Sequence, residues 1–236
     1  MPPSRRRAVV ERIEDLAPSV RAYHLRVEGK EPFSHQPGQW VSLLVPFWGG
    51  AAKRVYSIAS APAPAPKFEL CVKQGPGEQG DQYLGKLTRG ASVEFTGPGG
   101  TFVLREPVER EAFFIANGTG VAPLRAMLQA ALKASNGYRL TLLLGARSEP
   151  ELLYGDEWRT FESSHENFRF LATLSRPSAS WPGRKGRVLD QTASLIKGRS
   201  DIDVYVCGQP HLVTQVRRQC QEWGVPEERV HYEKYG

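Results

Sequence analysis

The chain has 236 residues, of which 40% are hydrophobic and 24% charged, with a formal net charge of +6 at pH 7. This length allows two domains that each bury a core, and the composition excludes global disorder. The apolar runs are far shorter than the roughly 20 residues of a membrane-spanning helix. Three cysteines, Cys71, Cys207 and Cys220, are too few for a disulfide framework, and the five histidines show no metal-ligand spacing. We therefore expect a cytoplasmic protein with no membrane span and no metal site.

Residues 1 to about 105 contain short strands separated by turns. Phe68, Leu70 and Val72 alternate with residues of other kinds, which predicts a half-buried strand. A short helix is expected at Tyr83–Thr88, capped by Asp81. Turns are expected at Pro37-Gly38, Gly49-Gly50, Pro62–Pro66, Gly75-Pro76-Gly77 and Gly97-Pro98-Gly99-Gly100. The spacing predicts an antiparallel barrel, with strands at Ala8–Ile13, Val20–Val27, Gln39–Val45, Lys53–Ile58, Phe68–Val72 and Ser92–Phe95.

From Ala112 onward, strands alternate with helices. Pro123 is expected to open the first helix, which the apolar spacing carries to Asn136-Gly137. Near-continuous apolar strands predict a parallel sheet covered on both faces. The strands are expected at Phe113–Ala116, Leu140–Ala146, Phe168–Leu174 and Val204–Cys207, and further helices near Pro150–Phe161, Val188–Lys197 and Pro210–Trp223. The segment Arg105–Arg110 is the expected boundary, dividing the chain into domains 1–106 and 107–236.

The loop Ala116–Pro123 joins a predicted strand to a predicted helix and contains Gly118, Thr119 and Gly120. Glycines let the backbone approach a ligand closely, and a helix N-terminus offers free N–H groups to an anion. The loop also lies at the expected carboxyl edge of the sheet, where nucleotides bind. A Gly-x-Gly sequence also occurs in structural turns, and its spacing here differs from the Rossmann pattern.

The quartet Arg54-Val55-Tyr56-Ser57 lies in a strand-like segment. Alternation places Arg54 and Tyr56 on one face and Ser57 on the other. A guanidinium group can clamp a diphosphate, and a phenol ring can stack on a flat heterocycle. The quartet also fits an exposed arginine beside a half-buried tyrosine, so the quartet alone does not distinguish a ligand-binding role from a structural one.

Three further motifs follow in order along the chain. Gly97–Phe102 has the pattern Gly-Pro-x-Gly-x-Phe, Cys207-Gly208 follows the last predicted parallel strand, and Arg229–Gly236 ends the chain with a terminal aromatic residue. With the two motifs above, this order resembles the ferredoxin–NADP reductase family over essentially the whole chain. The resemblance implies an FAD-binding β-barrel domain at 1–106 and an α/β NAD(P)-binding domain at 107–236 with an aromatic tail.

For the flavin, the resemblance implies that Arg54 holds the FAD pyrophosphate, Tyr56 lies against the isoalloxazine ring and Ser57 hydrogen-bonds near flavin N5. Asp81 departs from the family, which usually has Ser or Thr there. Its carboxylate would repel a diphosphate, so either Asp81 caps the helix and leaves Gln82 and backbone N–H groups to the phosphate, or FAD is held less tightly. The other implied FAD contacts are Val55, Val72, Lys73, Gly80, Gln82 and Tyr83.

For the nicotinamide nucleotide, the resemblance implies that its pyrophosphate binds to Gly118, Thr119, Gly120 and Val121, with Thr119 close to both cofactors. Cys207 and Gly208 would stand beside the nicotinamide. As a lone cysteine, Cys207 also fits a small buried apolar residue.

The C-terminal tail receives two implied roles. Glu233 would position the nicotinamide or exchange protons. Tyr235 would cover the flavin as a gate, so we expect the tail to be ordered.

NADPH is favoured over NADH because Ser175 and Arg176 follow a predicted strand, at the position where NADPH-using relatives hold the 2′-phosphate. Arg147 and either Lys185 or Arg187 would add positive charge, although these residues also fit a solvated loop.

The resemblance implies an FAD-dependent reductase that exchanges hydride with NADPH or NADH and single electrons with a separate carrier. The positive net charge favours an acidic carrier such as ferredoxin or flavodoxin, although a modest positive charge also fits a role in solubility alone. No basic cluster predicts nucleic-acid binding, and we expect a monomer. The alternatives are the NADH-dependent reductase component of a multicomponent oxygenase, a free-flavin reductase, or a flavin-binding electron-transfer subunit of a larger complex.

Overall fold

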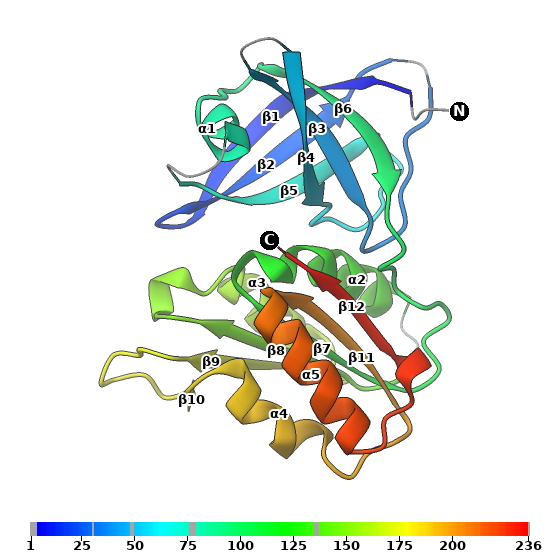
Figure 1. Cartoon of the computed structure of the whole chain (residues 1–236), viewed down its shortest axis with the longest axis vertical. Helices are drawn as coiled ribbons and strands as arrows, with labels where there is room; N and C mark the ends of the chain where they lie inside the picture. The colour runs from blue at the N-terminus through cyan, green and yellow to red at the C-terminus, as the bar shows by residue number, and fades with distance from the viewer. Residues whose placement is uncertain (1–3, 30, 48–49, 76–78, 135–136, 236) are drawn as a thin grey trace. The chain divides into compact units, whose positions relative to one another are not determined.

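The computed structural model describes residues 4–29, 31–47, 50–75, 79–134 and 137–235. Its contacts divide the chain into two compact units, each with its own sheet (Figure 1). One unit comprises Met1–Leu104 with Arg125–Ala130, and the other comprises Arg105–Leu124 with Ala131–Gly236. Among the described residues, no helix is both long and apolar enough to cross a membrane.

The first unit contains a six-stranded sheet with the order β4-β3-β6-β1-β2-β5, in which all neighbouring strands are antiparallel. A bridge between Ile58 and Leu70 links the chain just after β4 to β5, so the sheet closes around an apolar core. The predicted antiparallel barrel is confirmed. The strands are β1 (Arg6–Ala17), β2 (Val20–Val27), β3 (Trp40–Phe47), β4 (Gly50–Ser57), β5 (Lys67–Lys73) and β6 (Ser92–Gly99).

The prediction of a half-buried β5 is wrong, because both faces of this strand are covered. Glu69 and Cys71 are only 5% and 6% exposed, like the apolar residues between them. Glu69 is buried with a partner, since its Oε2 accepts a hydrogen bond of 3.0 Å from Arg125, which also donates to the Ala59 carbonyl at 2.8 Å. A sequence pattern reports the polarity of a side chain, whereas its partner decides whether it can be buried.

Two local predictions in the first unit are also wrong. The helix α1 spans Gln79–Gly85, so Asp81 lies inside the helix and does not precede it as a cap. This helix ends at Gly85, before Thr88, and the Leu84 carbonyl near its end accepts a 2.7 Å hydrogen bond from the buried Tyr23 hydroxyl. Gly97-Pro98-Gly99 continues β6, where Gly99 pairs with Trp40 of β3.

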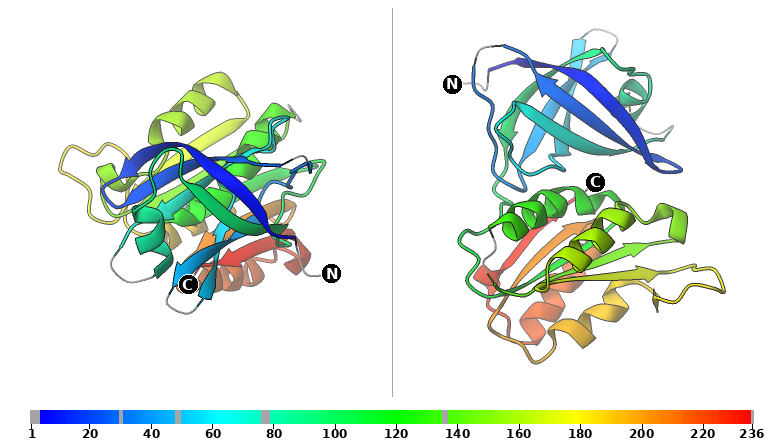
Figure 2. Two further views of the ribbon diagram at one scale, coloured as in Figure 1. Left: turned by 90° about the horizontal axis from the view of Figure 1, so that it is seen from above. Right: turned by 180° about the vertical axis from the view of Figure 1, so that it is seen from behind.

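The second unit is a six-stranded parallel sheet with the order β10-β9-β8-β7-β11-β12. Helices α2 (Val121–Lys133) and α3 (Gly155–Ser164) lie on one face, and α4 (Val188–Ile196) and α5 (Pro210–Glu222) lie on the other (Figures 1 and 2). The predicted parallel sheet with two covered faces is confirmed. Its strands are β7 (Glu111–Asn117), β8 (Leu140–Ala146), β9 (Phe168–Leu174), β10 (Arg184–Lys185), β11 (Ile202–Gly208) and β12 (Val230–Lys234), and its 3₁₀ turns are η1 (Gly118–Gly120), η2 (Glu149–Glu151) and η3 (Glu227–Arg229).

Two helices in this unit differ in their boundaries from the predictions. Helix α2 begins at Val121, two residues before Pro123, because the turn η1 leads directly into it. The predicted helix near Pro150–Phe161 is divided into η2 and α3. The ordered tail is confirmed as β12, which pairs in register with β11. Gly49, Pro76-Gly77 and Asn136, which belong to predicted turns and a helix end, lie outside the described residues.

Candidate active site

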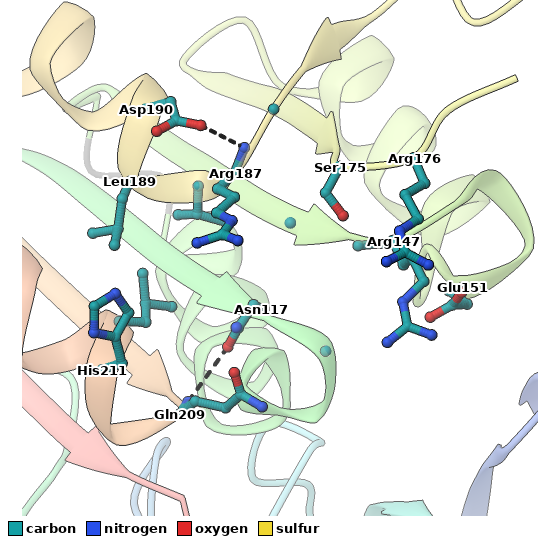
Figure 3. A pocket seen from close by; sticks show the side chains of 16 residues that line it. Asn117, Arg147, Glu151, Ser175, Arg176, Arg187, Leu189, Asp190, Gln209 and His211 are labelled. Atoms are coloured by element: carbon teal, nitrogen blue, oxygen red, sulfur yellow. Dashed lines mark hydrogen bonds between the residues drawn. The ribbon is translucent and has the colours of Figure 1, made fainter. Parts of the chain in front are cut away.

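A cavity of about 830 Å³ opens at the carboxyl ends of β7, β8, β9 and β11 (Figure 3). Carboxyl ends of parallel strands meet at one edge of a sheet, so residues that are far apart in the sequence come together there. The lining residues are Asn117, Gly118, Gly145, Ala146, Arg147, Glu151, Ser175, Arg176, Gly186, Arg187, Val188, Leu189, Asp190, Gln209, His211 and Leu212.

The glycine loop forms one wall of this cavity and is packed against the end of β11. Gly118 has a φ of +51°, and a Cβ on it would meet no atom within 4 Å, so its outer side is open to a ligand. Gly120 is closed in, because a Cβ there would lie 2.5 Å from the Cys207 carbonyl oxygen. Asn117 Oδ1 accepts a hydrogen bond of 3.4 Å from the backbone N–H of Gln209. The two loops therefore support each other.

Arg147 and Arg176 lie side by side at one end of the cavity (Figure 3). The backbone N–H of Arg176 donates to the Arg147 carbonyl at 2.7 Å, and the N–H of Ser175 donates to the Ala146 carbonyl at 3.1 Å. Both arginine side chains are exposed, and neither forms an ion pair within the described part of the chain. This end of the cavity offers positive charge to an anion.

Arg187 enters the cavity from the start of α4 (Figure 3). Its backbone N–H donates to Asp190 Oδ2 at 2.8 Å, which ties the start of the helix to its first turn. Lys185, the alternative that the sequence left open, lies in β10 and is not among the lining residues.

The C-terminal strand places its residues next to Cys207. In the pairing of β11 with β12, Cys207 is the partner of Glu233, and the Tyr235 N–H donates to the Gly208 carbonyl at 2.9 Å. Burial raises the pKa of the Cys207 thiol well above its ordinary value, and the negative charge of Glu233 adds to this effect, while a hydrogen bond with Tyr235 opposes it. At neutral pH, Cys207 is therefore a buried neutral thiol and not a thiolate nucleophile.

The predicted flavin residues lie in the first unit, mainly on β4. Arg54 and Tyr56 are half-buried, Ser57 is buried, and Val55 between them is 57% exposed. Arg54 donates from Nη1 to the Lys53 carbonyl at 3.1 Å, and Tyr56 packs against the barrel core. The strand thus carries a guanidinium group, a phenol ring and a hydroxyl group within four residues.

The remaining predicted flavin residues are in β5 and α1. Val72 is buried in the barrel core, so only its backbone could reach a ligand, whereas Lys73 is exposed at the strand end. In α1, Gln82 is exposed and Tyr83 is half-buried, and burial raises the pKa of Tyr83. The Asp81 side chain lies outside the described part, and Gly80 is described only by its place in the helix.

Several lining residues were missed from the sequence. Asn117, Glu151, Asp190, Gln209 and His211 all border the cavity. Asn117 ends β7 and Gln209 follows β11, so position at a strand end is the signal that could have found both. Glu151 and Asp190 have no comparable local signal, because the folding of the following turns brings them to the cavity. Conversely, Thr119, Cys207 and Gly208 do not line this cavity.

Two family models match the chain. The "Oxidoreductase FAD-binding domain" matches residues 7–104, and the "Oxidoreductase NAD-binding domain" matches residues 114–218. They cover the barrel and most of the parallel-sheet unit, respectively.

The similar curated proteins include a ferredoxin–NADP reductase and an electron transfer component of an oxygenase. Ferredoxin–NADP reductase B of Sorangium cellulosum is 39% identical over 94% of each chain. The electron transfer component of toluate 1,2-dioxygenase from Pseudomonas putida is 28% identical, and the match covers 97% of this chain and 67% of that protein. The chain thus spans about two thirds of the oxygenase relative.

Solved structures with a similar fold include two reductase or reductase-domain chains. The cytochrome P450 reductase GcoB of Amycolatopsis superposes with a TM-score of 0.88 at 29% identity, covering 99% of this chain and 70% of that one. The FAD/NAD-binding domain of nitric oxide dioxygenase from Vibrio cholerae superposes with a TM-score of 0.87 at 27% identity, covering 98% of both.

Proposed function

Because this chain belongs to the ferredoxin–NADP reductase family of FAD- and NAD-binding oxidoreductases, we propose that it exchanges hydride with NADPH and single electrons with a separate carrier protein. The observation that carries the preference for NADPH is the pair Arg147 and Arg176 in the cavity, which offers two guanidinium groups to one phosphate. When bound, FAD supplies the conversion between a hydride and single electrons.

The cavity residues fit a nicotinamide nucleotide. Gly118 leaves open space where a side chain would stand, and the N-terminal turn of α2 follows directly, so backbone N–H groups can bind the pyrophosphate. Ser175 adds a hydroxyl donor beside Arg176, and Arg187 brings a further positive charge from the opposite side. The residues of this wall bind and orient the nucleotide through its phosphates.

Cys207 and Glu233 are proposed to act at the nicotinamide end. Cys207 is 0% exposed and does not line the nucleotide cavity, so its neutral thiol would meet a nicotinamide ring only beyond that cavity, at the end of β11. There it would supply a small, soft surface and would not compete for the hydride carbon as a charged nucleophile. Glu233, its register partner on β12, orients the nicotinamide through hydrogen bonding.

The residues of β4 fit FAD by their chemistry. Arg54 would bind the pyrophosphate, Tyr56 would lie against the ring, and the Ser57 hydroxyl would hold a proton near N5. Because Asp81 lies inside α1 and does not cap it, we propose that its negative charge weakens FAD binding. Replacing Asp81 with Ser should then slow the loss of FAD on dialysis, and an unchanged rate of loss would contradict this role.

Tyr235 is proposed to shield the flavin until the nucleotide binds. Its backbone is held to β11 through the Gly208 carbonyl, so the residue is anchored and not frayed. A chain truncated before Tyr235 should bind NADP⁺ more tightly and transfer hydride at a different rate. If truncation changed neither value, Tyr235 would have no gating role.

The proposed carrier is an acidic protein such as ferredoxin or flavodoxin. The net charge of +6 favours encounter with an acidic partner, and such attraction raises the association rate more than the affinity. Raising the salt concentration should therefore slow reduction of the carrier while leaving reduction of a small neutral dye nearly unchanged. Equal slowing of both would argue against electrostatic docking.

The second candidate is the reductase component of an oxygenase, because the toluate dioxygenase component matches almost the whole chain. The higher identity to ferredoxin–NADP reductase B favours the first candidate. The first candidate uses NADPH and the second uses NADH, so an anaerobic titration with each nucleotide distinguishes the two candidates.

We also propose a cytoplasmic, monomeric protein. Cys71, Cys207 and Cys220 are buried and form no disulfide among the described residues, as expected in a reducing compartment. Cell fractionation and sedimentation velocity test the location and the monomeric state.

Anaerobic titration of the purified protein tests the proposed function directly. The preparation should be yellow, and NADPH should bleach the flavin absorbance at a lower concentration than NADH does. A colourless preparation that takes up no FAD would overturn the proposal, and a preference for NADH would move the assignment to the oxygenase candidate.

A further inference from the structure

The loop that carries Arg176 leaves the sheet just after the backbone pairing of Arg176 with Arg147. Two backbone hydrogen bonds extend the pairing of β8 with β9 as far as Arg176, whose N–H donates to the Arg147 carbonyl. The next residue, Pro177, has no N–H group, so the pairing cannot continue. The chain then returns to the sheet only at β10. A further contact is needed to fix this loop.

Glu149 provides that contact. Its Oε1 accepts a hydrogen bond of 3.0 Å from the Ser178 backbone N–H and a short one from the Ser178 hydroxyl. The Ser178 hydroxyl lies 3.0 Å from that of Ser180, which extends the cluster along the loop. The Ser178 hydroxyl lowers the pKa of Glu149, so its carboxylate is ionised at neutral pH. Hydrogen bonds to an ionised acceptor are stronger than those between neutral groups.

Glu149 does not line the nucleotide cavity, unlike its neighbour Glu151. The 3₁₀ turn η2 contains both carboxylates. Glu151 lines the cavity and accepts a 3.0 Å hydrogen bond from Ser148, whereas Glu149 is not among the lining residues. The Glu149 carboxylate therefore accepts hydrogen bonds from the loop and does not face a phosphate bound in the cavity.

We propose that Glu149 is a positioning residue for the 2′-phosphate of NADPH, because it holds the loop of Arg176 beside Arg147. This inference rests on the proposed preference for NADPH. Two guanidinium groups bind one phosphate well only when both are already placed, since ordering a mobile loop on binding reduces the affinity. The connection runs from η2 through Glu149 and Ser178 to Arg176, two residues earlier in the chain.

The test measures binding by calorimetry, with adenosine 2′,5′-bisphosphate and ADP as probes. Only the first carries the 2′-phosphate. Replacing Glu149 with Ala should weaken binding of the bisphosphate by about tenfold, equivalent to about 1.4 kcal/mol, and leave ADP binding unchanged. Glu149→Gln keeps an acceptor oxygen for the Ser178 N–H, so it should recover part of this loss. A general loss of folding would weaken both probes, and equal weakening would overturn the proposal.

Two further variants separate this inference from the proposed function. Glu162 is the matched control, because its carboxylate also accepts a backbone N–H, that of Phe170 at 3.1 Å, outside the cavity. Glu162→Ala should leave both affinities unchanged. Arg176→Ala should weaken the bisphosphate alone. If Arg176→Ala does so and Glu149→Ala does not, only the positioning role is wrong. If neither variant weakens the bisphosphate, the preference for NADPH is wrong as well.

Discussion

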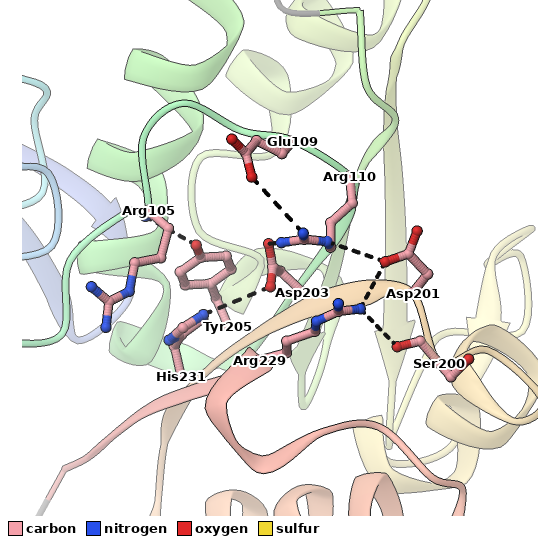
Figure 4. Close-up of polar contacts among 9 residues, drawn as sticks. All are labelled: Arg105, Glu109, Arg110, Ser200, Asp201, Asp203, Tyr205, Arg229 and His231. Atoms are coloured by element: carbon pink, nitrogen blue, oxygen red, sulfur yellow. Dashed lines mark hydrogen bonds and ion pairs between the residues drawn. The ribbon is translucent and has the colours of Figure 1, made fainter.

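The two edges of the parallel sheet use arginine in opposite ways. At the amino edge, Arg110 contacts Asp201 at 3.3 Å and Asp203 at 3.4 Å, and Arg229 contacts Asp201 at 2.7 Å (Figure 4). At the carboxyl edge, the exposed Arg147 and Arg176 have no acidic partner within the described residues (Figure 3). The comparison shows that one residue type stabilises the fold at one edge and is available to a ligand at the other.

A cluster of three rings next to the paired arginines of the amino edge supports a structural role for that edge. Phe114, Tyr205 and His231 are register neighbours on β7, β11 and β12, and their rings stack with centroids 5.0 and 4.6 Å apart. The Tyr205 hydroxyl accepts a 3.0 Å hydrogen bond from the Arg105 N–H, and burial raises the pKa of Tyr205 to about 12 (Figure 4). The Tyr205 hydroxyl is thus hydrogen-bonded inside the protein, and His231 Nε2 lies 3.9 Å from Asp203 Oδ1, so the cluster is engaged with the fold itself.

The largest expected effect is on stability, from the variant Asp203→Ala at the amino edge. Asp203 is 6% exposed and forms the inner contact of Arg110. Removing it should lower the free energy of unfolding by about 2–4 kcal/mol, because Arg110 loses its buried counter-ion and keeps only exposed acids such as Asp201 as partners. Urea denaturation measures the loss, and the Michaelis constant for NADPH should not change. The exposed Asp156, paired with Arg159, is the control, and Asp156→Ala should have little effect.

At the carboxyl edge, Arg176→Ala should weaken the use of NADPH and leave the stability of the fold unchanged. The Michaelis constant for NADPH should rise by about tenfold to a hundredfold, since a hydrogen bond to a charged group contributes roughly 1.5–3 kcal/mol. The constant for NADH and the urea midpoint should stay the same, because Arg176 has no ion-pair partner among the described residues. Steady-state kinetics with both nucleotides checks this, and a lowered midpoint would show that the two edges do not differ as described.

The amino edge should also make stability depend on pH. Burial raises the pKa of Asp203, but its interactions with His231 and Arg110 outweigh the effect of burial, so the pKa is lower than normal. The unfolded chain then binds the proton more readily. The resulting stabilisation is complete above the unfolded-state pKa of about 3.9 and is lost as the pH falls toward the folded-state value. Urea denaturation between pH 7 and pH 3 should show a smaller loss for Asp203→Asn than for the native chain.

The smallest expected effect comes from Glu151→Gln in the nucleotide cavity. Glu151 places a negative charge near Arg147 and Arg176 (Figure 3). Removing this charge should tighten binding of adenosine 2′,5′-bisphosphate by about twofold to fivefold, as screened charges near a surface interact weakly. Calorimetry measures the change. Weaker binding would mean that Glu151 orients the arginines instead of repelling the phosphate.

Much of the fold could be predicted because a strand that is buried on both faces is apolar along most of its length, and such a run is visible in the sequence. Leu140–Ala146 is a nearly continuous apolar run, and the structure contains β8 at these bounds, buried along almost its whole length. Phe168–Leu174 is mainly apolar but interrupted by Arg169, and it forms β9 at the predicted bounds. Val230–Lys234 carries no such run, and only its pairing with β11 makes it a strand. Glu69 looked exposed by pattern but is buried, because Arg125, distant in the sequence, neutralises it.

The candidate site was predictable to the extent that its residues follow strand ends. Arg147, Ser175 and Arg176 were found this way, and they line one cavity. Glu149 was not found, because its role depends on a contact with Ser178, 29 residues later. Asp81 was misplaced, because the start of a helix depends on how its apolar residues pack, and Leu84 is fully buried in the barrel.

The sequence by itself determined the two sheets and the order of the glycine loop, the arginines and the C-terminal residues along them, because periodicity and turn residues are local properties. Only the tertiary structure decided which charges are paired. Arg110 and Arg176 are the same residue type, each next to one end of a strand. The acids that neutralise Arg110 lie just before β11 (Asp201) and within it (Asp203). Electrostatic pairing depends on distance in space, and a linear sequence does not contain that distance.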